Sequence, residues 1–171
     1  MPNHLMIDLE TLNNTPTSAL LSIGAAAFNP QEQKIIDTHE WFILEISGTV
    51  SMDTLLWWLS QKPEAIGKLV VGLKGENAIP IDMALRQLAA FANNHKCKEV
   101  WSHGGSFDLP IIRYHSDRHH IPMPWKYWDE RCTRTLYSFK GKPTIQREGT
   151  HHSAMDDAVH QAKCVMEVIN R

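Results

Sequence analysis

The sequence predicts an α/β fold that begins with three antiparallel strands and continues with helices and shorter strands in alternation. Two observations indicate it. Apolar runs of strand length, separated by short turns, fill most of the first 44 residues, and helical spacing of apolar residues takes over after residue 50. The length of 171 residues is ordinary for one domain, and we expect a single domain over residues 1–171.

Composition narrows the class of protein. Hydrophobic residues make up 43% and charged residues 21%, as in a globular domain, and no apolar run is long enough to cross a bilayer. No secretory signal opens the sequence, so we expect a cytoplasmic protein without membrane partners. A formal net charge of −2 argues against a protein that coats duplex DNA by general electrostatics. The three cysteines lie far apart, which predicts neither a disulfide framework nor a zinc knuckle.

The three opening strands are bounded by turn residues. We expect them at Leu5–Thr11, Ala19–Phe28 and Lys34–Leu44. A polar segment containing Pro16 separates the first two, and the Asn29-Pro30 pair separates the second from the third. Connections this short require neighbouring strands to be antiparallel.

Two carboxylates lie near the end of the first strand. Residues i and i+2 of a strand share a face, so Asp8 and Glu10 point together while Ile7 and Leu9 point into the opposite layer. Like charges this close persist as anions only if a cation neutralises them. Mg²⁺ and Mn²⁺ prefer oxygen ligands, so the pair is a candidate metal site, although the same pattern also occurs on solvated strand faces.

Helical spacing predicts three helices in the middle of the chain. The first follows a capping residue at position 51 or 53, the second begins at Pro63, and the third spans Ile79–Asn93. The first helix carries Trp57 and Trp58, a pair that could stack on nucleic-acid bases. Adjacent helical positions point about 100° apart, so we expect one of the two indoles to pack in the core.

The second half alternates strands and helices. The expected elements are a strand at Lys98–Ser102, a helix at Ser106–His119, a strand near Lys126–Trp128, a helix near Glu130–Phe139 and a last helix ending about Asn170. Pro110 is tolerated in a helix only in its first turn, which places Asp108 at a helix start. An acidic residue there is either a cap and dipole partner or part of a site.

A third polar cluster precedes the last helix. In the segment His-His-Ser-Ala-Met-Asp-Asp, His152 falls in the stretch that enters the helix and Asp157 lies inside it. The arrangement puts a fixed carboxylate beside a mobile imidazole. The alternative is a histidine-rich loop that precedes an ordinary helix with acidic residues in its first turn and has no catalytic role.

Basic residues gather just before this cluster and form either a phosphate-facing patch or a solvated loop face. They are Lys126, Arg131, Arg134, Lys140, Lys142 and Arg147, and they are flanked by His115, His119, His120 and His151.

Three motifs follow one another across about 150 residues: Asp-x-Glu (Asp8, Glu10), Phe-Asp at a helix start (Asp108), and His-x-Ala-x-x-Asp-Ala (His152, Asp157). Together they resemble the DEDDh family of 3′-to-5′ exonucleases. The segments Asp-Leu-Glu-Thr-Leu, Leu-Leu-Ser-Ile-Gly-Ala and Thr-Leu-Leu-Trp-Trp-Leu-Ser-Gln-Lys-Pro-Glu-Ala further resemble a bacterial and phage branch, the Rv2179c-like exoribonucleases. This branch is also similar to a domain of exodeoxyribonuclease VIII.

The resemblance implies an RNase H-like fold, a mixed five-stranded sheet in the order 3-2-1-4-5 flanked by helices. It makes Asp8, Glu10, Asp108 and Asp157 the metal-binding carboxylates and His152 the general base. Two Mg²⁺ or Mn²⁺ ions roughly 4 Å apart would orient a water and stabilise the leaving 3′ oxygen, releasing a nucleoside 5′-monophosphate. An imidazole with a pKa near ~6.5 is suited to take the proton of that water at neutral pH.

The implied substrate is the 3′ end of single-stranded RNA or DNA. The branch favours RNA, although the residue that would contact the 2′-OH is not assigned by spacing. The family often forms homodimers, and we expect Trp125 and Trp128 to contribute to such a contact.

Three other functions are compatible with the motifs taken one at a time. They are a nucleic-acid-binding module of the same fold without catalysis, an RNase H-like endonuclease, and a zinc-binding interaction protein that uses His119, His120, His151 and His152.

Overall fold

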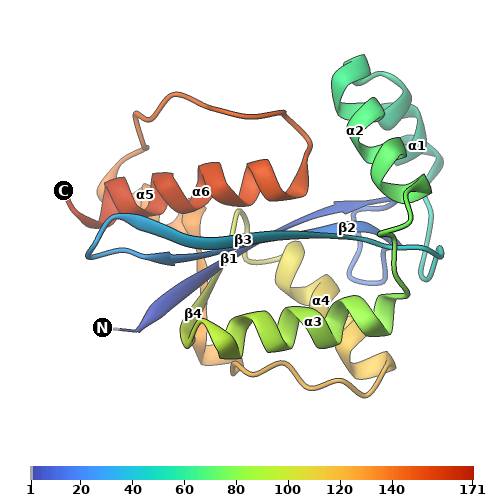
Figure 1. Ribbon diagram of the computed structural model, residues 1–171. Coiled ribbons are helices and arrows are strands. Elements are labelled where there is room, and N and C mark those ends of the chain that lie inside the picture. The colour runs from blue at the N-terminus through green and yellow to red at the C-terminus, as the bar shows by residue number, and fades with distance from the viewer. Residues whose placement is uncertain (1) are drawn as a thin grey trace.

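The computed structural model describes residues 2–171, and its centre is a five-stranded sheet with helices on both faces (Figure 1). The strands are β1 Asn3–Thr11, β2 Leu20–Asn29, β3 Lys34–Phe42, β4 Cys97–Ser102 and β5 Glu130–Cys132. Their order in the sheet is β3-β2-β1-β4-β5, which confirms the expected order 3-2-1-4-5. The predicted antiparallel pairing of the three opening strands is confirmed as well.

The central strand β1 is longer than its parallel neighbour. It pairs antiparallel with β2 along its length, but its pairing with β4 ends where Met6 meets Trp101. Asp8 and Glu10 therefore lie beyond the β4 ladder, opposite Gly24 and Ser22 of β2. The backbone of β1 past Met6 is left open on the β4 side, which is where another element can approach it.

Within residues 2–171, six α-helices pack around the sheet. They are α1 Met52–Leu59, α2 Pro63–Lys74, α3 Ile81–Asn94, α4 Asp108–Arg118, α5 Thr133–Lys140 and α6 Ala154–Ile169. Helix α6 covers one face of the sheet, α3 and α4 cover the other, and α1 and α2 stand at one end (Figure 1). Among the described residues, no helix has both the length and the apolarity needed to span a membrane.

Alternation along β1 divides the apolar core into two layers. Leu5, Ile7 and Leu9 pack with α3 and α4, whereas Met6 packs with Trp101 and the apolar side of α6. All four side chains are buried, and full burial of such a side chain contributes roughly 1.5–3 kcal/mol. The expectation that Ile7 and Leu9 face away from Asp8 and Glu10 is confirmed, because Asp8 hydrogen-bonds to α6.

A glycine lets α6 begin directly on the sheet. The position that a Cβ atom of Gly24 would occupy overlaps the backbone of Ala154 and Met155, the first two residues of α6. A side chain at residue 24 would therefore push the start of the helix away from β2. Since Gly24 lies opposite Asp8, this close approach holds the first turn of α6 above the β1 carboxylates.

The predicted strand near Lys126–Trp128 and the predicted helix start at Glu130 are wrong. Tyr127–Asp129 forms a 3-10 turn, in which the Asp129 carboxylate accepts a hydrogen bond from the backbone N of Lys126 at 2.9 Å. The strand is Glu130–Cys132, and the helix starts only at Thr133. Parallel pairing of Glu130–Cys132 with β4 selects this segment, a long-range contact that overrides local pattern.

Candidate active site

The β1 carboxylates face the N-terminal half of α6. Gln161 of α6 donates a hydrogen bond from Nε2 to Oδ1 of Asp8 at 2.7 Å. Glu10 is only 6% exposed and lies on the same face, two residues on, just before a register shift that ends the regular pairing of β1 with β2. The strand thus places two carboxylates, half-buried Asp8 and buried Glu10, on the face that α6 covers.

Asp108 reaches the same region from the opposite layer. It is the first residue of α4 and is 3% exposed. Its Oδ1 accepts a hydrogen bond from the backbone N of Leu9 at 3.2 Å, on the part of β1 that β4 leaves open. Of the two interpretations of Asp108, cap or site, the geometry favours the site.

Asp157 and His152 complete the cluster from the start of α6. Single ligand atoms of Glu10, His152 and Asp157 all lie within 4.8 Å of one another. The backbone N of His152 donates to Oδ2 of Asp157 at 3.1 Å. His152 has a φ of 60°, a left-handed conformation that costs a non-glycine residue on the order of 1 kcal/mol and recurs at functional sites.

Two indoles of α1 hold the imidazole of His152. The ring centroid of His152 lies 4.8 Å from that of Trp57 and 6.3 Å from that of Trp58, both in edge-to-face geometry. Trp58 is 7% exposed and donates from Nε1 to the carbonyl O of Thr11 at 2.9 Å, so it is anchored to β1. Trp57 is 43% exposed. The prediction that one indole packs in the core is confirmed, and the second faces the site.

Burial and mutual repulsion raise the pKa values of the three carboxylates from β1 and α4, which are Asp8, Glu10 and Asp108. Burial, with help from Glu40 and Asp108, raises the pKa of Glu10 to about 8. Burial raises the pKa of Asp108 to about 7. The pKa of Asp8 is raised well above its ordinary value by burial and by the charges of Asp108 and Glu10. A group of carboxylates in this condition is stabilised by any cation that enters it.

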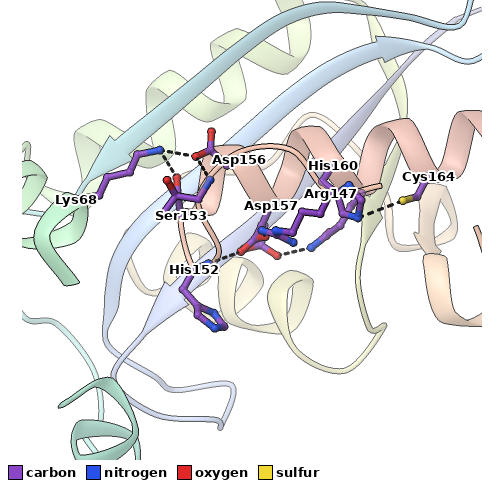
Figure 2. A network of polar contacts seen from close by, with 11 residues as sticks. Lys68, Arg147, His152, Ser153, Asp156, Asp157, His160 and Cys164 are labelled. Atoms are coloured by element: carbon purple, nitrogen blue, oxygen red, sulfur yellow. Dashed lines mark hydrogen bonds and ion pairs between the residues drawn. The ribbon is translucent and has the colours of Figure 1, made fainter. Parts of the chain in front are cut away.

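The first turn of α6 is held by cations from two other segments (Figure 2). Lys68 of α2 donates from Nζ to Oγ of Ser153 at 2.5 Å and to Oδ2 of Asp156 at 2.8 Å. Arg147, from the segment between α5 and α6, forms an ion pair with Asp157. The position of Asp157 is therefore determined by the helix and by a counter-charge at its side chain.

Sequence reasoning missed several neighbours of the site. The sequence pattern presents Arg147 only as one of several loop cations, and it predicts neither Gln161 as a neighbour of Asp8 nor the contact between Trp57 and His152. Gln161 lies four residues after Asp157, and helical periodicity alone would have placed both on one face. The contacts of Arg147 and Trp57 join segments far apart in sequence, and no local pattern predicts them.

The basic segment does not act as one surface. Arg131 pairs with Glu99 at 3.2 Å, and Arg147 pairs with Asp157, so two of its cations serve internal contacts. The four-histidine zinc site is wrong for the residues that the structure describes. Within residues 2–171 the one group of three or more metal-ligating side chains is Glu10, His152 and Asp157, and it contains neither His119 nor His120.

The fold recurs in solved exonuclease structures. The nuclease domain of 3′hExo, a DEDDh family member bound to rAMP, superposes with a TM-score of 0.68 at 14% identity, covering 98% of this chain and 92% of that one. E. coli Exonuclease I in complex with a dA16 oligonucleotide gives a TM-score of 0.71 at 13% identity, covering 100% of this chain but 41% of that one. Cell-death related nuclease 4 gives 0.58 at 12% identity, covering 99% and 64%.

At these identities the likeness establishes the fold, an RNase H-like exonuclease architecture. No curated protein sequence matches the chain. A family model described as the 3′-5′ exoribonuclease Rv2179c-like domain matches residues 3–169, nearly the whole chain. The protein therefore belongs to the Rv2179c-like family, whose model is described as a 3′-5′ exoribonuclease domain.

Proposed function

We propose that the protein removes nucleotides one at a time from the 3′ end of single-stranded RNA, releasing nucleoside 5′-monophosphates. The observation that carries the proposal is the grouping of Glu10, His152 and Asp157, whose ligand atoms lie within 4.8 Å of one another. Asp8 and Asp108 lie beside this group, near enough that the charges of Asp108 and Glu10 raise the pKa of Asp8. Four carboxylates can hold the divalent ions that assist phosphodiester hydrolysis, and a histidine can take a proton from the attacking water.

The carboxylates suit Mg²⁺ or Mn²⁺. They are oxygen ligands, and their raised pKa values mark a cluster that lacks sufficient positive charge of its own. Two such ions, held by Asp8, Glu10, Asp108 and Asp157, would supply Lewis acidity at the attacked phosphate. Gln161 and the backbone N of Leu9 each keep one oxygen of Asp8 and Asp108 oriented by hydrogen bonding.

His152 is the proposed general base. Its pKa is lowered by burial and by the positive charge of His151 and Arg147, so its imidazole is neutral and able to accept a proton at neutral pH. The edge-to-face contacts with Trp57 and Trp58 restrict the ring, which otherwise sits on a segment without regular structure.

A cavity beside Glu10 suits the terminal nucleotide. It has a volume of 360 Å³ and lies between β1 and α1, with Trp57, Trp58 and Phe107 in its walls. Aromatic walls stack on a base, and base stacking on an aromatic side chain contributes roughly 1–3 kcal/mol. Because the cavity adjoins the carboxylates, a nucleotide seated there would present its 5′ phosphate to them.

RNA is proposed over DNA on the strength of the family description, while E. coli Exonuclease I, of similar fold, was solved with DNA. The preference can be measured by incubating matched 5′-labelled single strands of RNA and DNA with the protein, in Mg²⁺ and in Mn²⁺, and comparing their degradation. We expect a ladder of shortened 5′-labelled RNA, and resistance when the 3′ end carries a bulky block. Cleavage of circular or blocked strands would point to an endonuclease, and binding without nucleotide release to a non-catalytic module.

A further inference from the structure

The guanidinium of Arg147 lies inside the carboxylate cluster. Its Nη2 forms an ion pair with Oδ1 of Asp157, and the side chains of the pair are only 21% and 12% exposed. The charge of Arg147 also acts on the two β1 carboxylates, lowering the pKa of both Asp8 and Glu10 against the opposing effect of burial. Figure 2 shows the side chain running alongside α6 toward Asp157.

Arg147 is held beside Asp157 by electrostatic attraction and not by a complete set of hydrogen bonds to its guanidinium. Its Nε is buried, yet within residues 2–171 it donates to no acceptor. An arginine with a permanent structural role usually has its N–H groups matched by acceptors. The residue also belongs to the segment between α5 and α6, which has no helix or strand, so its side chain can leave without breaking regular structure.

We propose that Arg147 is the counter-cation of the metal-free cluster, and that it exchanges Asp157 for the substrate phosphate when divalent ions bind. The proposal rests on the metal-dependent function proposed above. An oxygen of Asp157 that ligates a divalent ion is no longer available to Arg147, and the two cations repel each other. The displaced guanidinium stays tethered beside the cluster.

The phosphate is the partner that this displaced group fits. A guanidinium presents parallel N–H donors that match two oxygens of a phosphate, and such charge-assisted bonds are among the strongest in proteins. The attacked phosphate of a strand bound at the four carboxylates would lie beside them, within reach of a side chain that already touches Asp157. Arg147 would then neutralise charge on the phosphate without ligating metal.

Arg147→Gln tests the exchange because it should change two affinities in opposite directions, the affinity for Mg²⁺ and the affinity for a nucleotide phosphate. We expect Mg²⁺, measured alone by calorimetry, to bind Arg147→Gln roughly 10-fold more tightly than wild type, a typical size for coupling between two sites. With Mg²⁺ saturating, adenosine 5′-monophosphate should bind the same variant roughly 10-fold more weakly.

Lys163→Gln is the matched control. It removes one positive charge from the same neighbourhood, since Lys163 pairs at 2.7 Å with Glu148, the residue after Arg147. Both affinities of Lys163→Gln should stay near those of wild type at about 0.1 M salt, where exposed charges are screened over about 10 Å. A purely structural role for Arg147 would weaken both metal and nucleotide binding, and that result would overturn the proposal.

A second measurement needs no variant. An arginine-selective dicarbonyl reagent, with peptide mass spectrometry, reports how accessible each arginine is. Adding Mg²⁺ to the wild-type protein should raise the modification rate of Arg147 and leave that of Arg113, which is paired with Glu130 away from the cluster, unchanged. Unchanged or greater protection of Arg147 would refute the exchange. Wild-type protein that binds no Mg²⁺ at all would instead refute the proposed function.

Discussion

The backbone N–H of His152 donates a hydrogen bond to Oδ2 of Asp157 over 3.1 Å. The contact uses the main chain of one residue and the side chain of the other, which leaves the imidazole free to face Trp57. Substituting His152 therefore removes the ring without removing this bond. The proposed roles of the two residues, general base and metal ligand, can be tested separately.

His152→Ala should lower turnover by a factor on the order of 10²–10⁴ while leaving Mg²⁺ affinity nearly intact, because a general base moves a proton without holding the metal. Steady-state kinetics and metal calorimetry measure the two effects. His151→Ala is the control, since His151 is exposed and outside the Glu10–His152–Asp157 group. An inactive His151 variant beside a fully active His152 variant would contradict the assignment.

The pH profile gives an independent test of the same role. Burial, His151 and Arg147 lower the pKa of His152 below the ordinary value of 6.5, so the neutral form persists into mildly acidic solution. Wild-type turnover should fall only as the pH drops below that value, when the imidazole takes up a proton. This acid limb should be missing in His152→Ala. An identical limb in both proteins would assign it to another group.

Asp157→Asn should abolish activity and weaken Mg²⁺ binding together. The amide keeps the shape of the side chain but supplies no charge to anchor a hard cation. It also removes the ion pair with Arg147, so circular dichroism and thermal unfolding should accompany the assay. Wild-type Mg²⁺ affinity in a folded Asp157→Asn protein would remove Asp157 from the ligand set.

Gly24→Ala should destabilise the protein by roughly 1–3 kcal/mol, the usual cost of overpacking, because the new methyl group overlaps the start of α6. Activity should fall as well, since Asp157 moves with that turn. Gly67→Ala in α2 is the control. Its Cβ would meet no atom within 4 Å, and the change should stabilise by roughly 0.5–1 kcal/mol. Chemical denaturation of both variants measures the difference, and equal effects would argue against the close approach.

The metal-free protein should lose stability as the pH rises from about 5 to about 8. The folded pKa values of Glu10, about 8, and Asp108, about 7, lie above the ordinary values of 4.5 and 3.8. The native state therefore binds more protons than the unfolded chain between those limits, and stability falls with pH. Thermal unfolding in chelator should show this slope, and saturating Mg²⁺ should flatten it. A rising slope in chelator would contradict the raised pKa values.

We predict that the protein forms a homodimer through a surface that includes Trp128. Trp128 is 59% exposed and stacks edge-to-face with Tyr127, whereas Trp125 packs against the core beside α4 and is less available. Trp128→Glu should shift the sedimentation coefficient toward that of a monomer. Val71→Glu, at an exposed position of α2, should leave it unchanged. Wild-type protein that sediments only as a monomer at micromolar concentration would remove the prediction.

Several features of this protein follow from the sequence because they depend on spacing within one element. The two-residue period of a strand places Asp8 and Glu10 on one face, and short connections make the first three strands antiparallel. Pro110 places Asp108 at a helix start, and the His-x-Ala-x-x-Asp spacing places His152 before the helix that contains Asp157. The strand order and the assignment of roles came from family resemblance, since no local pattern specifies which strands pair.

Only the tertiary structure decided the contacts between elements. β5 is Glu130–Cys132 because that segment pairs with β4. Asp108 lies beside β1 because β1 extends beyond its pairing with β4, which leaves the N–H of Leu9 free to donate to the Asp108 carboxylate. The pairing of Arg147 with Asp157 likewise joins a loop to a helix. Such contacts depend on how whole layers pack, which is the sum of many weak interactions between residues distant in sequence. The spacing of residues along the sequence therefore does not predict these contacts.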